Sequence, residues 1–171
     1  MTFYYLDTSA LVKYYILEAG STWVRGIVDA LSFDKQSRVN VIFISDACIP
    51  EAAAAFSVLE RTSRISRRTR DRVFRATMHH IAVGLLSTLR VDSEDFHLAA
   101  TLTQSHPLKA YDAVQLAVAL RCRQVLAALR LPLIFITGDR SLLAAARAEG
   151  LSAENPFDHV VHQDAPETPE G

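Results

Sequence analysis

Short apolar segments rich in β-branched and aromatic residues alternate along the chain with longer segments of helical periodicity. Short runs of this composition predict strands, and apolar residues that recur every three or four positions predict helices. The predicted strands lie at 3–6, 39–44, 89–91 and 131–137. The predicted helices lie at about 8–17, 21–33, 46–62, 66–86, 93–105, 109–130 and 140–149.

The alternation of strands and helices favours an α/β fold. Strands that are separated by helical crossovers cannot pair as hairpins, so they should lie parallel, with helices on both faces of the sheet. We therefore expect one three-layer α/β/α domain over residues 1–157, with a central, mainly parallel sheet of four to five strands. The 171-residue length suits a single core of this kind. Residues 158–171 should form an acidic, flexible tail, because they are rich in polar residues and lack apolar periodicity.

The composition is that of a soluble globular protein, with 50% hydrophobic and 22% charged residues. No apolar stretch approaches the length of a membrane span, and the first residues lack the basic-then-apolar pattern of a signal peptide. We therefore expect a cytoplasmic protein without a membrane partner. The two cysteines, Cys48 and Cys122, lie in apolar helical segments and are predicted to be buried free thiols.

Charge is distributed unevenly along the chain. Residues 152–171 contain five acidic and no basic residues, which leaves 18 basic and 14 acidic residues in the remainder. The segment 61–75 alone contains seven arginines and one aspartate. On a continuous helix, five of them would line one face, namely Arg61, Arg64, Arg68, Arg72 and Arg75. Three interpretations remain open: a solvated face, contact with RNA phosphates, or docking of an acidic partner or of the chain's own tail.

Every strand-to-helix junction carries at least one carboxylate. The sequence places them at Asp7, at Asp46 and Glu51, at Asp112 and at Asp139. Each has a local alternative, because Asp7 or Thr8, Asp112 with Gln115, and Asp139 all fit helix caps. In a parallel sheet, however, the carboxyl ends of the strands share one edge. Like charges gathered there repel, and a hard cation such as Mg²⁺ or Mn²⁺ would relieve that repulsion.

Two threonines and one proline bear on this predicted metal site. Thr8 and Thr137 could orient a carboxylate or a bound water by hydrogen bonding. Pro50 directly precedes Glu51, and proline is tolerated only in the first turn of a helix. A helix that begins at Ser45 would be kinked by Pro50, whereas one that begins near Ile49 would leave Glu51 near the N-terminus. Asp46 is the alternative acid if Glu51 points elsewhere.

Four segments occur in the order typical of one family: YLDTSALVKYYILEAGS, the alanine-rich helix headed by Glu51, LKAYDAVQLAVAL and FITGDRSLLAAARAEGL. The sequence resembles the PIN-domain ribonucleases, especially the VapC-like toxins of bacterial toxin–antitoxin pairs. The resemblance covers about residues 3–157. It implies that four acidic residues, Asp7, Glu51, Asp112 and Asp139, hold one or two Mg²⁺ or Mn²⁺ ions. It also implies that Thr8 supplies the hydroxyl beside Asp7.

The resemblance further implies a metal-dependent endoribonuclease that cleaves single-stranded or structured RNA. It also implies an antitoxin partner and a homodimer. Two other functions remain open: a non-catalytic RNA- or protein-binding module, and a phosphatase with Asp7 as its covalent nucleophile. The phosphatase is disfavoured because Ser9 stands where such chemistry usually needs a second aspartate. The six histidines show no spacing typical of a zinc site.

Overall fold

The computed structural model describes residues 1–31, 37–161 and 164 of the chain. The strands are β1 (Thr2–Leu6), β2 (Asn40–Ser45), β3 (Ser87–Leu89), β4 (Leu133–Ile136) and β5 (Ser152–Glu154). The helices are α1 (Thr8–Tyr15), α2 (Ser21–Val28), α3 (Cys48–Arg61), α4 (Arg67–Ala82), α5 (Ser93–Ser105), α6 (Ala110–Ala128) and α7 (Arg140–Ala148). A short 3₁₀ helix, η1 (Pro156–His159), follows β5.

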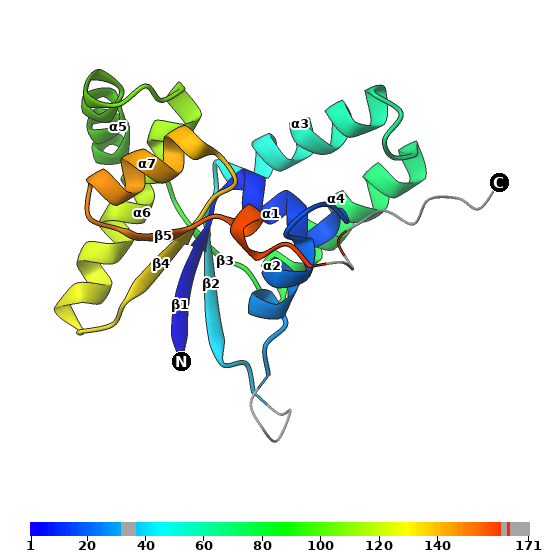
Figure 1. Ribbon diagram of the computed structural model, residues 1–171, viewed down its shortest axis with the longest axis horizontal. Coiled ribbons are helices and arrows are strands. Elements are labelled where there is room, and N and C mark those ends of the chain that lie inside the picture. The colour runs from blue at the N-terminus through cyan, green and yellow to red at the C-terminus, as the bar shows by residue number, and fades with distance from the viewer. Residues whose placement is uncertain (32–36, 162–163, 165–171) are drawn as a thin grey trace.

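The strands form one parallel sheet in the order β3-β2-β1-β4-β5. The parallel α/β prediction is therefore confirmed, and Figure 1 shows the strands running side by side between two groups of helices. The fifth strand, β5, has no counterpart among the four strand-like runs of the sequence. Its three residues, SAE, are too short and too polar for the pattern to reveal, and its pairing with β4 forms it.

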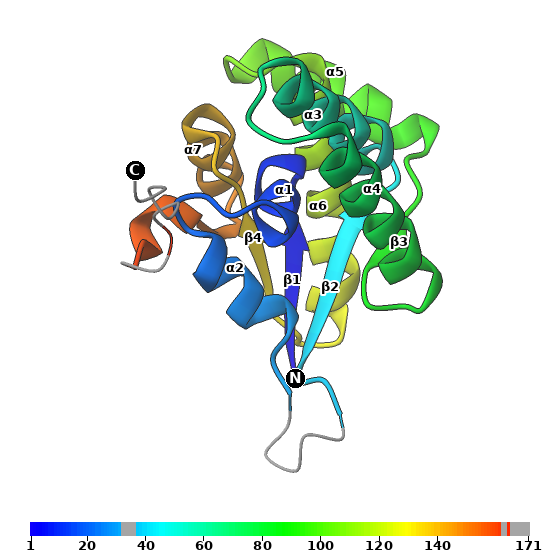
Figure 2. The ribbon, with the colours of Figure 1, turned by 90° about the vertical axis from the view of Figure 1, so that its right-hand side faces the viewer.

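Two hydrophobic cores lie on opposite faces of the sheet. One is built from α5, α6 and α7 against Tyr5 and Phe135. The other is built from α1, α2, α3 and α4 against Leu6, Ile44 and Ile136. Alternate residues of β1 and β4 thus point into different cores, as the period of a strand requires. The result is the three-layer α/β/α arrangement, which Figure 2 shows from a second direction.

The helix boundaries settle the question of Pro50. Helix α3 begins at Cys48, so Pro50 lies in its first turn and removes no interior hydrogen bond. Glu51 follows directly, near the positive end of the helix dipole. The helix predicted over 21–33 is shorter in the structure, because α2 ends at Val28.

Both cysteines are buried and free, as predicted. Burial raises the pKa of each thiol to about 11, so neither is a reactive thiolate at neutral pH. Among the described residues, no helix combines the length and the apolar character needed to cross a membrane.

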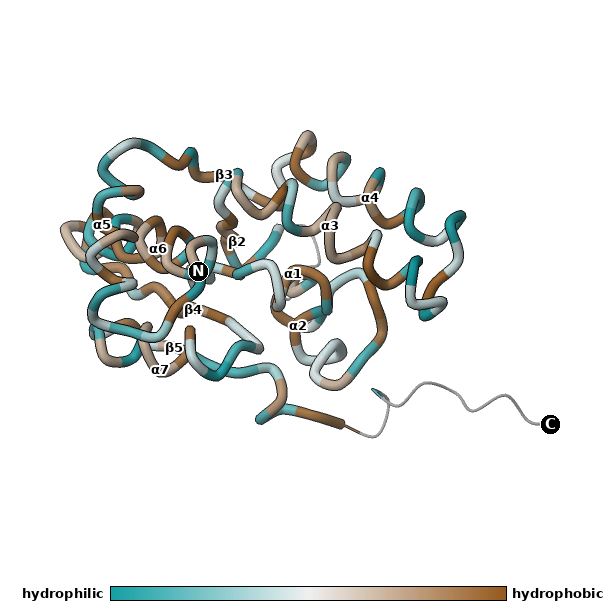
Figure 3. Tube along the Cα trace, turned by 90° about the horizontal axis from the view of Figure 1, so that it is seen from above, coloured by the Kyte–Doolittle hydropathy of each residue, from teal (hydrophilic) through white to brown (hydrophobic). Residues whose placement is uncertain are grey.

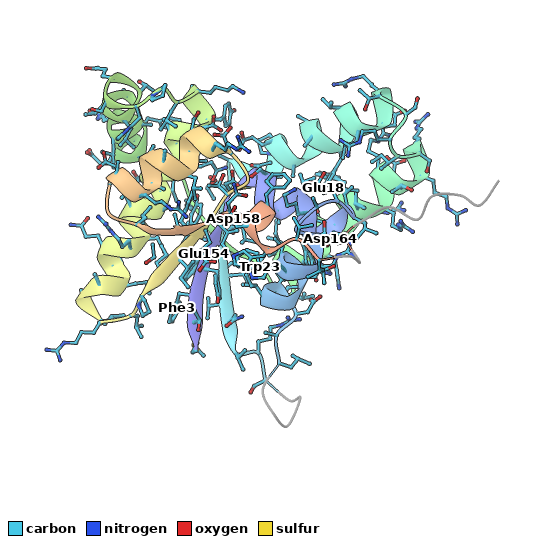
Figure 4. All side chains as sticks on the ribbon, viewed as in Figure 1. Phe3, Glu18, Trp23, Glu154, Asp158 and Asp164 are labelled. Atoms are coloured by element: carbon cyan, nitrogen blue, oxygen red, sulfur yellow. The ribbon has the colours of Figure 1, made fainter. Side chains whose placement is uncertain are left out.

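The first part of the predicted tail packs against α2 in the structure. The His159 ring stacks on Trp23 with 4.0 Å between ring centroids. The Asp164 carboxylate accepts hydrogen bonds from the backbone N–H groups of Gly20 and Thr22. Figure 4 labels Trp23 and Asp164, which lie on the same side of the molecule beside α2. The rest of the predicted tail, 162–163 and 165–171, lies outside the described residues.

Candidate active site

An open cavity of about 540 Å³ lies beyond the carboxyl ends of β1 and β4. Its walls come from the starts of α1, α3, α6 and α7. Thr8 lines it, and so do the four acids that the family resemblance implies as metal-binding positions, Asp7, Glu51, Asp112 and Asp139. The structure therefore brings together residues that are up to 132 positions apart in the chain because parallel strands end at one edge.

Asp7 lies at the centre of the sheet edge and is only 4% exposed. Its Oδ1 accepts hydrogen bonds from the Ala10 N–H and the Ser9 hydroxyl, both at 2.8 Å. Its Oδ2 accepts one from the Thr137 hydroxyl at 2.7 Å. Asp7 thus caps α1, as the local alternative predicted, and lines the cavity as well. Thr137 orients a carboxylate in this structure.

The pKa of Asp7 is raised to about 6. Burial is the main cause, because it removes water from the charged form. Hydrogen bonds from Thr137, Ala10 and Ser9 oppose the shift, and the charge of Asp112 adds to it. Asp7 is therefore a carboxylate that its surroundings hold in place without neutralising its charge.

Glu51 is held by two side chains. Its Oε2 accepts hydrogen bonds from the Thr8 hydroxyl at 2.6 Å and from the Gln115 amide nitrogen at 2.8 Å. The orientation of the Gln115 amide is fixed in turn, since its oxygen accepts from Tyr5 and Ser45. Thr8 does not cap α1, because Asp7 does. Its hydroxyl orients Glu51 instead.

Asp112 and Asp139 differ in their local roles. Asp139 caps α7 through the Leu142 N–H, so the capping interpretation is confirmed there. Asp112 lies inside the first turn of α6, whose N-cap is Lys109 without a side-chain bond, so the predicted capping box with Gln115 is wrong. Burial raises the pKa of Asp112, and the charges of Asp139 and Glu51 raise it further. The carboxylates therefore interact across the cavity.

Lys13 is the basic residue among the described residues that line the cavity. Its ammonium is buried, bonds to Glu18 Oε1 at 2.8 Å and lies 3.9 Å from the centroid of the Phe157 ring. Glu18, which Figure 4 labels, thus takes up the one positive charge of the cavity wall. The four matched carboxylates keep an excess of negative charge.

The donor set suits a hard divalent cation, since it consists of carboxylate and hydroxyl oxygens. Within the described residues, no three carboxylate, imidazole or thiol side chains already stand close enough together to form a complete metal site. The hydrogen bonds explain this spacing, because Thr137, which follows β4, and Ser9 of α1 hold Asp7, whereas Thr8 of α1 and Gln115 of α6 hold Glu51. The residues fit a cation in chemistry and in charge.

The sequence pattern missed two residues of this network. The sequence pattern indicates only a capping role for Gln115, yet this residue is 2% exposed and contacts Glu51. Ser9 donates to Asp7 and accepts from the Gly138 N–H at 2.7 Å. A buried-looking polar residue on the apolar side of a helix was the available signal for Gln115. Asp46, the alternative acid, lies outside the cavity and binds the Val91 N–H instead.

The arginine-rich segment 61–75 does not form one helical face. It spans the turn between α3 and α4, where Ser63 has a left-handed φ of 58°. Arg70 pairs with Asp71 and Glu60. Within the described residues, no ion pair is formed by the exposed Arg61, Arg67, Arg68, Arg72 and Arg75. Figure 3 shows this hydrophilic tip at the end of the hairpin formed by α3 and α4.

Comparison with known proteins gives likenesses in structure. No protein-family model and no curated protein sequence matches the chain. The fold is similar to that of PAE2754 from Pyrobaculum aerophilum, with a TM-score of 0.56, 20% identity and 95% coverage of both chains. It is also similar to FitAB bound to an IR36 DNA fragment, with a TM-score of 0.59, 17% identity, and coverage of 93% of this chain and 98% of that chain. A toxin–antitoxin complex from Klebsiella pneumoniae is more distant, with a TM-score of 0.48, 18% identity, and coverage of 90% and 97%.

The likenesses to PAE2754 and to FitAB extend over nearly the whole of each chain. They confirm the three-layer, PIN-like fold that the sequence resemblance implies.

Proposed function

We propose that the chain is an endoribonuclease that depends on Mg²⁺ or Mn²⁺ and hydrolyses phosphodiester bonds of single-stranded or structured RNA. The observation that carries the proposal is the convergence of Asp7, Glu51, Asp112 and Asp139 on one cavity, where Lys13, the one lysine among the described lining residues, is already paired with Glu18. Carboxylates that repel one another in this way are typical of sites that bind cations. The PIN-like fold supports the same conclusion.

Each acid has a role in this proposal. Asp7 and Asp112 would be the direct metal ligands, and Glu51 and Asp139 would complete the site, directly or through water. A bound Mg²⁺ or Mn²⁺ neutralises charge on phosphoryl oxygens and lowers the pKa of a bound water. Thr137 and Ser9 keep Asp7 aimed at the cavity, and Thr8 and Gln115 do the same for Glu51.

The test is cleavage of a pool of RNA oligonucleotides by the purified full chain. We expect cleavage with Mg²⁺ or Mn²⁺, no cleavage with a chelator, and recovery when the metal is restored. Calorimetric titration of the metal should show binding that weakens in Asp7→Asn and Asp112→Asn. Cleavage that is unchanged in both variants would contradict the assignment of the site.

The non-catalytic alternative has one observation in its favour. Among the described residues, no three His, Cys, Asp or Glu side chains lie close enough together to coordinate one metal ion. Metal binding without cleavage of any RNA in the pool would support an RNA- or protein-binding module. The phosphatase alternative is weaker, because Asp7 is buried and three donors hold its oxygens.

We also propose that the chain is the toxin of a toxin–antitoxin pair and forms a homodimer. The sequence resemblance and the shared fold support this proposal. If a short open reading frame lies directly upstream, its product should bind the chain and inhibit RNA cleavage. Light scattering of the chain alone would give its oligomeric state, and a monomeric mass at micromolar concentration would contradict the homodimer.

A further inference from the structure

A second cavity, of about 360 Å³, lies on the other side of the first turn of α6. It lies where β2 and β3 end and where α5 and α6 begin. Its lining is mostly apolar and includes one acid, Asp46. The lining residues are Asp46, Ala47, Val91, Phe96, Ala110, Tyr111 and Val114. We call it the aromatic pocket, because Phe96 and Tyr111 are its large side chains.

Both aromatic residues are more than half exposed to solvent. Phe96 is 57% exposed and Tyr111 is 54% exposed. Exposed aromatic faces beside a cavity cost free energy in water, so they are commonly binding surfaces. A volume near 360 Å³ lies within the range of pockets for small ring systems and is small for a protein segment.

Asp46 supplies the pocket with a specific polar group. Its Oδ1 accepts a hydrogen bond from the Val91 N–H at 3.0 Å, which fixes the carboxylate. Within the described residues, Oδ2 accepts no hydrogen bond. No basic residue occurs among the described residues that line the pocket, so the pocket does not suit a phosphate. It suits an uncharged, planar group with an N–H donor on its edge.

The aromatic pocket and the acidic cavity are lined by different residues of the same turns at the start of α6. Asp112 and Gln115 line the acidic cavity, whereas Tyr111 and Val114 line the aromatic pocket. With 3.6 residues per turn, these pairs lie on adjoining sides of the same helical turns. A nucleotide whose phosphate lies in the acidic cavity therefore has the aromatic pocket next to it.

We propose that the aromatic pocket binds one unpaired base of the RNA substrate, adjacent to the phosphodiester that is cut. The base stacks against both Tyr111 and Phe96, and its amino group donates a hydrogen bond to Asp46 Oδ2. Single-stranded RNA is typically recognised by aromatic stacking together with hydrogen bonds to base edges. This inference rests on the proposed ribonuclease function and gives it a base preference, for bases that carry an amino group.

The experiment uses short single-stranded RNAs that carry the fluorescent base 2-aminopurine at one position at a time. Binding to the full chain is measured in Ca²⁺, with the RNA checked on a gel to be intact. We expect fluorescence quenching at one position, because stacking on an aromatic ring quenches this base. Tyr111→Ala and Phe96→Ala should each remove most of the quenching and weaken binding about tenfold.

Two further variants control this experiment. Val125→Ala removes an exposed apolar side chain from the far end of α6 and should change neither quenching nor affinity. Asp46→Asn should reduce the preference for amino-bearing bases over uracil at the quenched position, because an amide can also donate. An unchanged base preference would contradict the role of Asp46.

Three results would overturn the inference or separate it from the proposed function. Normal RNA cleavage without quenching at any position would overturn the proposed binding of a base in the aromatic pocket and leave the ribonuclease proposal intact. Quenching that depends on Tyr111, in a chain that does not cleave RNA, would overturn the proposed ribonuclease activity and leave the proposed base binding intact. A change of oligomeric state in Tyr111→Ala, with quenching unaffected, identifies the pocket as an interface between copies of the chain and overturns the inference.

Discussion

The acidic cavity and the arginine-rich tip between α3 and α4 carry opposite charges and are built in opposite ways. In the cavity, Asp7 and Glu51 are fixed by hydrogen bonds from neighbouring elements. At the tip, Arg68 and Arg72 are exposed and form no ion pair within the described part of the chain. The two regions lie at opposite ends of α3, since Glu51 of the cavity is in its first turn and the tip follows its last residue, Arg61; Figure 1 shows the two ends of this helix.

The comparison between the cavity and the tip shows that buried charged side chains need hydrogen-bond partners from the fold, whereas exposed ones do not. Burial of a carboxylate costs free energy unless donors satisfy it, so Asp7 requires Ser9, Ala10 and Thr137 around it. An exposed arginine keeps its water and needs no partner, so its side chain imposes little on the fold. Substitutions in the cavity should therefore change chemistry and stability, whereas substitutions at the tip should change affinity alone.

The largest effect is expected on catalysis in Asp112→Asn. Loss of one negative ligand at the proposed metal site should lower kcat for RNA cleavage on the order of 10³-fold. Metal-dependent RNA cleavage assays would measure it. Glu94→Gln is the matched control, because Glu94 is an exposed acid on α5 outside the cavity, and it should cut RNA as well as the parent.

Gln115→Leu should affect both stability and activity. It leaves the hydroxyls of Tyr5 and Ser45 without their acceptor and frees Glu51 on one side. We expect a loss of about 2–4 kcal/mol in the free energy of unfolding, and about 10–100-fold lower activity. Urea denaturation and RNA cleavage assays measure the two effects. Gln124→Leu, an exposed position on the same helix, should lower neither; equal losses in both variants would argue against the network.

In the metal-free protein, the free energy of unfolding of Asp7→Asn relative to the parent should rise between about pH 4 and about pH 6. The pKa of Asp7 is about 6 in the folded protein and 3.8 in the unfolded chain, so the folded state holds the proton more tightly between these values. Stability from this group is present below about pH 4 and is lost as the pH rises to about 6, by roughly 2–3 kcal/mol. Urea denaturation in the presence of a chelator should show that the free energy of unfolding of the variant increases relative to that of the parent as the pH rises across this range. Parallel pH profiles of the two proteins would contradict the burial of an ionised Asp7.

The smallest effect on stability is expected at the tip. Arg68→Glu combined with Arg72→Glu should change the free energy of unfolding by less than about 0.5 kcal/mol. If the tip contacts RNA phosphates, RNA binding should weaken about tenfold at low salt, and less at high salt. Fluorescence anisotropy with a labelled RNA measures this. Unchanged RNA binding together with weaker binding of an acidic partner would assign the tip to that partner.

Local chemistry explains what was predictable about the fold. The apolar runs around Tyr5, Ile44 and Phe135 were recognisable as strands because they are dense in β-branched and aromatic residues. Helix α7 was recognisable because Asp139 precedes a run of leucine and alanine. The strand β5 was not, since three residues carry no periodicity and only the exposed edge of β4 makes them a strand.

The sequence by itself determined the parallel α/β class, the acid at each strand end and the hydroxyls beside them. These follow from local periodicity and from the fixed direction of parallel strands. Only the tertiary structure decided which acids share a cavity: Glu51 lies in it and Asp46 outside it, although five positions separate them. Gln115 likewise became a positioning residue only through its contacts with Tyr5, Ser45 and Glu51. The physical reason is that hydrogen bonds between distant segments depend on packing, which no local pattern records.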